Sequence, residues 1–516
     1  MKILIPKALC LAMTLCAINA VASVLPSYQT SDQWFVDAKD VVEQRNNLVA
    51  DTNKAKNVIL FVGDGMGVST MTAARILQGQ MRGETGEENF LSFERFPYTG
   101  LVKTYNTNQQ TPDSAGTMTA MATGIKTKAG VLNIAPNGLR GDCDSSKGFE
   151  LTTIFEYAEA QGLSTGVVST ARITHATPAA TFAKTPERNW ESDDKLTDEA
   201  KAAGCTDIAT QFVEFGKGDG IDVAFGGGRR HFLPKDVTDI EGKAGKRTDG
   251  VNLTEKWQEK TQGTYVEDKA GFDSIPADAT KVLGLFNASH MRYESDRAND
   301  VAGEPSLTEM TTKAIDILNK RGDKGYVLVV ESGRIDHAHH AGNAYNALKD
   351  TLEYANAINA AKELAGDDTL IMVTADHGHV FTMAGYAVRG NPILGKVVGT
   401  DRSGNPKSEL TLARDELPYT TLGYTNGLGF RNLGSETNAD ASYADEPITG
   451  RHDLTAIDTT LPGFHQEALI PLGSETHSGE DISVHAVGPG AAYVQGVIEQ
   501  NSIFHIINKA LGLNAE

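Results

Sequence analysis

Short apolar runs bounded by turn-forming residues recur along the chain and alternate with longer amphipathic stretches. The runs VILFV, VLVV, LIMVT and TGVVST are rich in β-branched residues, and they predict buried strands at 58–62, 327–330, 370–374 and 165–170. Segments 152–162 and 307–322 repeat apolar residues at helical spacing. Alternation of strand and helix over most of a chain is typical of an α/β fold. We therefore expect a mostly parallel central sheet flanked by helices on both faces.

Three segments depart from this alternation. Residues 31–47 predict an amphipathic helix ahead of the first strand. Residues 385–470 are rich in Gly, Asn, Thr and Asp, and we interpret them as an irregular subdomain inserted in the main domain. Residues 235–282 have the composition of a second polar insertion. We therefore expect one large domain over 23–516, with its main insertion at about 385–470.

The first 22 residues have the pattern of a signal peptide. Lys2 and Lys7 form a basic start, residues 8–17 are apolar, and an A-x-A cleavage motif ends at Ala22. A membrane anchor is the alternative, but the apolar run is too short to cross a bilayer. The mature chain is predicted to begin at Ser23, in the periplasm or outside the cell. No later stretch is apolar enough to predict a membrane span.

Charge and cysteine content narrow the function classes. The 516 residues include 47 Lys and Arg against 67 Asp and Glu, a formal net charge of −20, which disfavours binding to nucleic acids. An anionic substrate would need a locally positive site, supplied by a metal ion or an arginine. Beyond the signal peptide only Cys143 and Cys205 remain, and in an exported chain they are expected to form a disulfide. Two buried thiols are the alternative, and no C-x-x-C motif suggests a cysteine-bound metal.

Acidic residues follow three of the predicted strands. VILFV runs into Asp64, VLVV into Glu331, and LIMVT into Asp376 and His377. In open α/β sheets, binding sites form beyond the carboxyl ends of the strands. Three carboxylates that converge there would repel one another unless a cation lies between them. The strand ends therefore predict a metal site.

Histidine placement agrees with this prediction. Five of the 13 histidines fall in the two windows ESGRIDHAHH (331–340) and ADHGH (375–379), although a solvated polar turn is the alternative for any single histidine. Asp336 and His340 are four residues apart, so one helical face can present both to one ion. Mixed His and Asp ligands without Cys favour zinc. A set of oxygen ligands such as Asp64, Glu331 and Thr177 favours magnesium.

Ser114 is the candidate nucleophile. It precedes a run of small residues in TPDSAGTMTAMATG (111–124) that predicts a helix, and a helix N-terminus favours a phosphate or an alkoxide. The alternative is a helix-capping serine beside Asp113. No G-x-S-x-G motif is present here, so activation by a metal is the natural route. Arg172 and Arg188 could each bind two phosphate oxygens, or each could form an ordinary surface ion pair.

These residues lie in motifs that resemble the alkaline phosphatase family. The resemblance covers nearly the whole mature chain and is closer to animal-type and related marine bacterial sequences than to the enteric bacterial type. It is carried by KNVILFVGDGMGVSTMTAARIL (56–77), TPDSAGTMTAMATGIKT (111–127), ITHATPAATFA (173–183), ERNWESD (187–193), VLVVESGRIDHAHH (327–340), VTADHGHVFT (373–382) and SETHSGEDISVHAVGPGA (474–491).

The resemblance implies a role for each matching residue. Ser114 would form a phosphoseryl intermediate, and Arg188 would bind the phosphate. One zinc would be held by Asp336, His340 and His477, and a second by Asp64, Asp376 and His377. Magnesium would be held by Asp64, Thr177 and Glu331. His175 would lie in the outer shell of that site and His337 near the phosphate; the enteric type has Asp and Lys at these two positions.

The implied function is hydrolysis of small-molecule phosphate monoesters at alkaline pH. The resemblance also implies a homodimer whose interface lies near the 385–470 insertion, and it supports a disulfide between Cys143 and Cys205. Calcium, which the animal enzymes bind, is not expected, because Asn287 stands where they have a glutamate. A phosphodiesterase or sulfatase of the same superfamily is the first alternative, although TPDSAGT lacks the sulfatase C/S-x-P-x-R signature. A non-catalytic metal-binding or phosphate-binding protein is the second.

Overall fold

The computed structural model describes residues 25–441 and 450–513, and the chain forms two compact units, Met1–Val49 and Ala50–Glu516. The described part of the first unit contains α1 (Ser27–Thr30) and α2 (Gln33–Asn46), and none of their residues is buried. The backbone N–H of Trp34 donates to the Asp32 carboxylate, which caps α2. The helix predicted at 31–47 is therefore confirmed. The predicted signal peptide lies outside the described residues.

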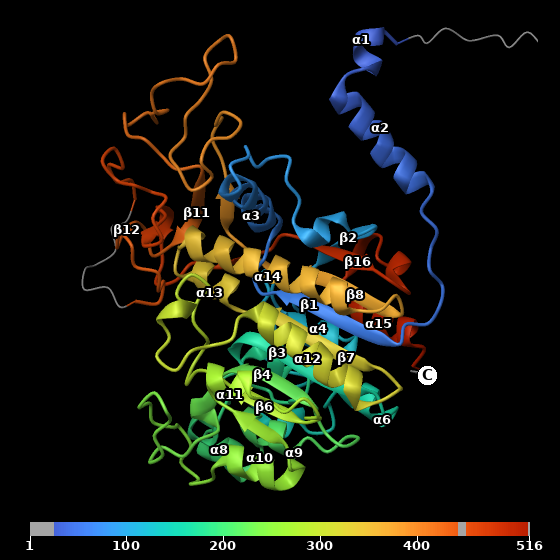
Figure 1. The fold of residues 1–516 in the computed structure, drawn as a ribbon. Helices are drawn as coiled ribbons and strands as arrows, with labels where there is room; N and C mark the ends of the chain where they lie inside the picture. Colours follow the sequence, from blue (N-terminus) through green and yellow to red (C-terminus); the bar gives the residue numbers. More distant parts are fainter. Residues whose placement is uncertain (1–24, 442–449, 514–516) are drawn as a thin grey trace, which may run out of the picture. The chain divides into compact units, whose positions relative to one another are not determined.

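The second unit is built on a ten-stranded sheet with the order β17-β2-β16-β8-β1-β7-β3-β4-β6-β5 (Figure 1). Its strands are β1 (Asn57–Gly63), β2 (Tyr98–Lys103), β3 (Ser164–Arg172), β4 (Val223–Gly227), β5 (Thr264–Val266), β6 (Val282–Leu285), β7 (Tyr326–Ser332), β8 (Thr369–Ala375), β16 (Ile482–Val487) and β17 (Gly496–Glu499). Only β16 is antiparallel to its neighbours. The mostly parallel sheet and all four predicted strands are confirmed.

Helices cover both faces of this sheet. The long helices are α3 (Val68–Met81), α4 (Ser114–Thr123), α12 (Leu307–Arg321), α14 (Ala344–Leu364) and α15 (Ser502–Leu511). Helices α12 and α14 pack against each other in front of the strands in Figure 1, whereas α4 and α15 lie behind them. Residues 154–160 form α6 and residues 307–321 form α12, which confirms the helices predicted at 152–162 and 307–322.

Shorter elements complete the described part of the unit. The helices are α5 (Cys143–Ser146), α7 (Ala176–Ala179), α8 (Asp198–Ala202), α9 (Ile208–Glu214), α10 (Leu253–Thr261), α11 (Lys269–Asp273) and α13 (Arg334–His340). Five single turns of 3₁₀ helix lie at Ser92–Arg95, Asp193–Lys195, Arg229–His231, Arg297–Asn299 and Ala491–Tyr493. Across the described residues, no helix has the length and apolarity needed to span a bilayer.

The two polar segments differ from each other. Segment 235–282 is not simply an insertion, because it contains α10, α11 and β5, and it leads into β6 at the edge of the main sheet. Residues 384–421 contain only turns and isolated bridges. The small strands that follow or flank them are β10 (Phe381–Met383), β11 (Leu422–Gly427), β12 (Arg431–Asn432), β13 (Phe464–His465) and β14 (Ala468–Pro471). Composition thus predicted the irregular backbone of the longer segment.

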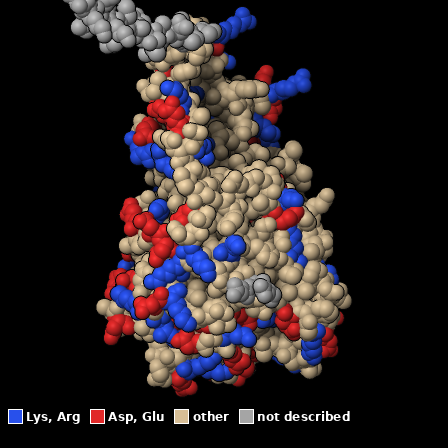
Figure 2. All heavy atoms as spheres, turned by 90° about the vertical axis from the view of Figure 1, so that its right-hand side faces the viewer, with Lys and Arg blue, Asp and Glu red and all other residues tan. Residues whose placement is uncertain are grey.

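Charged side chains of both signs are mixed on one face of the protein (Figure 2). On the face shown there, basic and acidic side chains lie beside one another and are not separated by sign.

Cys143 and Cys205 form a disulfide with their Cα atoms 6.0 Å apart, which confirms the predicted pairing. The bond joins α5 to the turn after α8, where Trp190, Leu196 and Ala200 form a small apolar cluster around it.

The sheet order explains how the acidic residues meet. Strands β8, β1 and β7 are neighbours, and all three are parallel and fully buried. Gly63, the last residue of β1, pairs with Ser332 on one side and Ala375 on the other. The carboxyl ends of the three strands therefore lie at one edge of the sheet, where Asp64 and Asp376 follow directly.

Candidate active site

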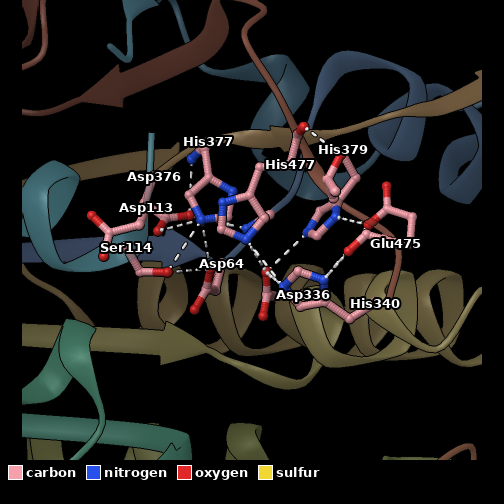
Figure 3. A network of polar contacts seen from close by, with 12 residues as sticks. Asp64, Asp113, Ser114, Asp336, His340, Asp376, His377, His379, Glu475 and His477 are labelled. Carbon is pink, nitrogen blue, oxygen red and sulfur yellow. Dashed lines mark hydrogen bonds and ion pairs between the residues drawn. The ribbon is translucent and has the colours of Figure 1, made fainter. Parts of the chain in front are cut away.

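Ser114 is the first residue of α4 and is almost fully buried. The helix is capped by Asp113 and not by Ser114, because the Gly116 N–H donates to the Asp113 carboxylate at 3.1 Å. The serine hydroxyl is thus free for other contacts. Its Oγ lies 3.2 Å from Nε2 of His377 and 3.5 Å from Oδ1 of Asp64 (Figure 3). The helix N-terminus and two candidate metal ligands therefore converge on one hydroxyl.

The first candidate metal group contains Asp64, Asp376 and His377, and its ligand atoms lie within 4.8 Å of one another. Nε2 of His377 is 3.5 Å from the Asp64 carboxylate and 3.2 Å from the Asp376 carboxylate. The Gly65 N–H donates to Asp376 at 3.0 Å and fixes its orientation. All three side chains are inaccessible to solvent. Two carboxylates and one imidazole are a donor set that suits zinc.

The second group lies beside the first and contains Asp336, His340 and His477. Nε2 of both histidines lies 3.3 Å from Oδ1 of Asp336, and the two Nε2 atoms are 3.1 Å apart. Asp336 and His340 come from one face of α13, as their spacing predicted. His477 comes from β15 (His477–Ser478), which pairs with β9 (Gly378–His379). His477 is far from Asp336 and His340 in the sequence, so residue spacing could not predict it as a ligand. Only the ETHSGED motif indicated this role.

The third group contains the oxygen donors Asp64, Thr177 and Glu331. One oxygen of each side chain is buried and has no hydrogen-bond partner: Asp64 Oδ2, Thr177 Oγ1 and Glu331 Oε1. Three such orphaned oxygens are expensive without a cation, and hard ions such as Mg²⁺ prefer this type of ligand. His175 also approaches this group, since one of its nitrogens lies within 4.8 Å of ligand atoms of Asp64 and Glu331.

Burial and neighbouring carboxylates raise the pKa values of the acids in the first and third groups, whereas the nearby histidines hold the pKa of Asp336 in the second group well below its usual value. Burial, followed by repulsion from Asp376, Asp336 and Glu331, holds the pKa of Asp64 well above its usual value. Burial and the charge of Asp376 raise the pKa of Glu331 to about 7, despite a hydrogen bond from Ser169. A cation bound among these carboxylates would therefore stabilise their ionised forms. The sequence prediction that the strand ends require a cation agrees with this electrostatics.

The two candidate phosphate-binding arginines have different surroundings. Nη1 of Arg188 lies 3.0 Å from the Asp113 carboxylate, and its Nη2 lies 3.1 Å from Nε2 of His175. Asp113 therefore joins Arg188 to the helix that carries Ser114. Arg172 instead forms a two-point ion pair with Glu191 at 2.7 Å. The structure brings Arg188 to Ser114 and leaves Arg172 bound elsewhere.

Two further residues support the second group, and the sequence analysis did not assign them a role. Nε2 of His379 lies 2.9 Å from Asp336, and its Nδ1 lies 2.6 Å from Glu475. Burial alone would lower the pKa of His379, but Glu475 and Asp336 together raise it to about 10. The imidazolium thus orients Asp336. His379 lies in the ADHGH window, so a signal existed, whereas nothing in the sequence linked Glu475 to it.

Replacing Glu475 by Gln tests this arrangement. We expect kcat/KM for a phosphate monoester to fall about 10-fold to 100-fold, because an outer-shell partner that orients a metal ligand has effects of that size. The zinc concentration needed for half-maximal activity should rise in parallel. Glu499→Gln, at a half-buried glutamate that pairs with Lys103 and Lys126, is the control and should match the unmodified protein. Equal zinc dependence in both variants would contradict the role of Glu475.

An open cavity of about 670 Å³ adjoins the second group. It is lined by the loop Gln109–Pro112 and by residues 474–477, together with His340. The lining contains no Lys or Arg, so this opening can admit uncharged groups of many shapes. The uncharged alcohol portion of a phosphate ester bound at Ser114 has room in this opening.

Glu304, which lies beside Asn287, gives the protein a pH-dependent stability. Nδ2 of Asn287 donates to Glu304 at 2.8 Å, and burial together with the charge of Asp300 raises the pKa of Glu304 to about 8. The folded protein therefore holds this proton to a higher pH than the unfolded chain does. Protonated Glu304 therefore contributes fully to folding stability at low pH, and this contribution is lost as pH rises from about 4.5 to about 8.

Glu304→Gln should remove this pH dependence, because glutamine resembles the protonated acid and cannot ionise. Between pH 5 and pH 9, the unfolding free energy of the variant should rise by about 1–2 kcal/mol relative to that of the unmodified protein. This is less than the full pKa shift of Glu304 would give. Urea unfolding at both pH values measures this gain. Glu259→Gln, at an exposed glutamate, should show no such gain. If the Glu304 variant and the unmodified protein lose stability in parallel, Glu304 ionises normally in the folded state.

Comparison with known proteins identifies the family. The alkaline phosphatase family model matches residues 55–513. The chain belongs to the alkaline phosphatase family. It is 40% identical over 506 residues to the tissue-nonspecific alkaline phosphatase of Gallus gallus, covering 96% of this chain and 92% of that one. The corresponding isozyme of Homo sapiens is 38% identical over 520 residues, covering 98% and 93%.

Solved structures of alkaline phosphatases share the fold. The enzyme from Thermus thermophilus superposes with a TM-score of 0.61 at 24% identity, over 96% of this chain and 97% of that one. The enzyme from the Antarctic bacterium TAB5 gives 0.58 at 22% identity, over 90% and 99%. The protein is therefore an enzyme of the alkaline phosphatase class, and both the family and the fold support phosphomonoesterase activity. The resemblance stated from the motifs is confirmed.

Proposed function

We propose that the protein hydrolyses phosphate monoesters through a phosphoseryl intermediate on Ser114, with two zinc ions and one magnesium ion as cofactors. The observation that carries this proposal is the surroundings of the Ser114 hydroxyl. It lies at the N-terminus of α4, within 3.5 Å of Asp64 and 3.2 Å of His377, and Asp113 links the same helix to Arg188. A nucleophile, its candidate activating ligands and a phosphate-binding cation thus occupy one site.

The reaction needs two displacements at phosphorus. In the first, Ser114 Oγ forms a bond to phosphorus, the ester oxygen leaves with its electron pair, and the alcohol takes up a proton. In the second, water attacks the phosphoserine, and the Ser114 oxygen leaves and is reprotonated. Arg188 donates hydrogen bonds to the equatorial phosphate oxygens, where negative charge is present throughout. The free N–H groups at the start of α4 add positive potential.

The donor sets fit the proposed metals. Asp336, His340 and His477 would hold one zinc, Asp64, Asp376 and His377 the other, and Asp64, Thr177 and Glu331 the magnesium. Bound ions would neutralise the carboxylates and favour deprotonation of the attacking oxygen. The orphaned oxygens of the third group support the magnesium assignment. A variant of the TAB5 enzyme carries magnesium in a site called M3.

His175 and His337 complete the proposed site. Their ring centroids lie 5.5 Å apart, and burial followed by the charge of Arg188 lowers the pKa of His175. A neutral His175 can accept a hydrogen bond from Arg188 and hold it toward the phosphate. We further propose that the enzyme is exported after cleavage behind Ala22 and that it acts as a homodimer.

Substrate discrimination tests this function. The purified protein, loaded with zinc and magnesium, should hydrolyse p-nitrophenyl phosphate with a rate that rises from pH 7 to pH 10. The corresponding phosphate diester and sulfate ester should react at least about a thousandfold more slowly, because each carries one negative charge where the monoester carries two, and the diester also lacks the third free oxygen. Chelation should abolish activity, and zinc with magnesium should restore it. Preference for the diester or the sulfate would transfer the assignment to those classes.

A further inference from the structure

A second cavity, of about 480 Å³, has a strongly basic wall. Five cationic side chains line it: Arg230, Lys243, Lys246, Arg292 and Arg334. Among the described residues of the same wall, the carboxylates are Glu241 and Asp440. This excess of positive charge occurs in a chain whose formal net charge is −20. The charge of the cavity wall is therefore opposite in sign to the net charge of the chain.

The two carboxylates are already neutralised from within the protein. Glu241 is bound by Nη2 of Arg229 at 2.7 Å. Asp440 pairs with Arg334 and accepts a hydrogen bond from the Tyr293 hydroxyl at 2.7 Å. Neither carboxylate is left to balance a further cation. Arg292 pairs with Asp296 at 3.1 Å and with Asp300 at 3.6 Å. The charge that is available to a ligand is therefore that of the other three wall cations.

Three of the wall cations have no anionic partner in the described chain. Over residues 25–441 and 450–513, no carboxylate lies within 4.0 Å of Arg230, Lys243 or Lys246. Burial, followed by the charge of Arg172, lowers the pKa of Arg230, although the charges of Glu191 and Asp194 act in the opposite direction. One planar guanidinium and two mobile ammonium groups suit an oxyanion that carries more than one negative charge.

The cavity adjoins the candidate active site through a layer of histidines. His290 forms part of the wall, and its ring centroid lies 4.0 Å from that of His337 and 5.2 Å from that of His175. Nε2 of His175 is 3.1 Å from Arg188. Nδ1 of His290 is buried without a hydrogen-bond partner. A series of ring contacts thus runs from the basic wall to the arginine that would bind the transferred phosphate.

We propose that this cavity is a second phosphate-binding site, with Arg230, Lys243 and Lys246 as its charge-bearing residues. The phosphate can come from two sources, which are a distal phosphate of a substrate or free inorganic phosphate. The first source rests on the proposed function, and the second does not. In either case the site takes a phosphate other than the one transferred to Ser114.

The test uses the metal-loaded enzyme and a triple variant, Arg230→Gln with Lys243→Gln and Lys246→Gln. The first measurement compares kcat/KM for ATP and for p-nitrophenyl phosphate at low ionic strength. If the cavity holds a distal phosphate, the value for ATP should fall about tenfold or more, the loss expected for charge-assisted contacts, while the value for p-nitrophenyl phosphate stays within about twofold. The control variant, Lys201→Gln with Lys217→Gln and Lys407→Gln, removes the same charge from exposed positions and should not change the ratio.

The second measurement is calorimetric titration of both variants and the unmodified protein with inorganic phosphate. If the cavity holds free phosphate, the unmodified protein and the control should bind two equivalents and the triple variant one. A selective fall in kcat/KM for ATP in the triple variant supports the site and identifies a distal phosphate as its ligand. Loss of the second bound equivalent of phosphate supports the site and identifies free phosphate. The proposal is overturned if the triple variant behaves as the control in both measurements. If no ester is hydrolysed at all, the proposed function fails, and the titration still decides whether the cavity binds phosphate.

Discussion

Replacing Ser114 by Ala should reduce kcat/KM for p-nitrophenyl phosphate by at least about a thousandfold. The side chain that would form the bond to phosphorus is lost, and only direct attack by water remains. The fold should survive, because Asp113, and not Ser114, caps α4 through the Gly116 N–H. Loss of a cap would otherwise have made a stability defect and a catalytic defect difficult to separate.

Two measurements make this result specific for a covalent mechanism. Acid quenching during turnover, followed by intact mass analysis, should reveal the added mass of one phosphoryl group on the unmodified protein and none on the variant. Ser146→Ala, at a buried serine in α5, serves as the matched control and should retain full activity and labelling. Hydrolysis by the Ser114 variant at the original rate would instead show that water attacks the ester directly.

Replacing Asp64 by Asn should have a comparably large effect, because Asp64 belongs to two of the three candidate metal groups. We expect kcat/KM to fall at least about a thousandfold and the metal content to fall from three ions to about one per chain. Stability should respond in opposite directions with and without metal. Burial and the neighbouring carboxylates hold the pKa of Asp64 far above normal, so in the metal-free protein at pH 8 its charge is destabilising.

Thermal unfolding of both forms tests this reversal. The metal-free Asp64→Asn variant should melt above the metal-free unmodified protein, and the metal-loaded variant should melt below its unmodified counterpart. Asp350→Asn is the control, since Asp350 is also buried with a strongly raised pKa but lies outside the candidate metal groups. It should keep its metals and activity. Full metal content in the Asp64 variant would contradict its bridging position.

Local sequence patterns were sufficient for the core of the fold and for part of the site. The strands β1, β7 and β8 are continuous apolar runs because parallel strands are buried on both faces, and this leaves a strong signal. The acids at their ends and the Asp336–His340 spacing were visible for the same local reason. Motif resemblance, not periodicity, supplied His477. The extension of the sheet by β5 was not predicted, because a three-residue strand within a polar segment carries too little apolar pattern.

The sequence by itself thus determined the α/β class, the position of Ser114 at a helix start and the chemical type of the site. Tertiary structure alone decided the strand order β8-β1-β7, and this order brings Asp64, Glu331 and Asp376 together from distant segments. The resemblance had already favoured Arg188, and the structure adds that Arg188 contacts Asp113, the residue before Ser114. Arg172 is bound by Glu191 instead. The Glu475–His379 pair and the basic cavity were likewise invisible along the chain. Such contacts join residues far apart in sequence, and their free energy depends on distance and burial, which no local pattern encodes.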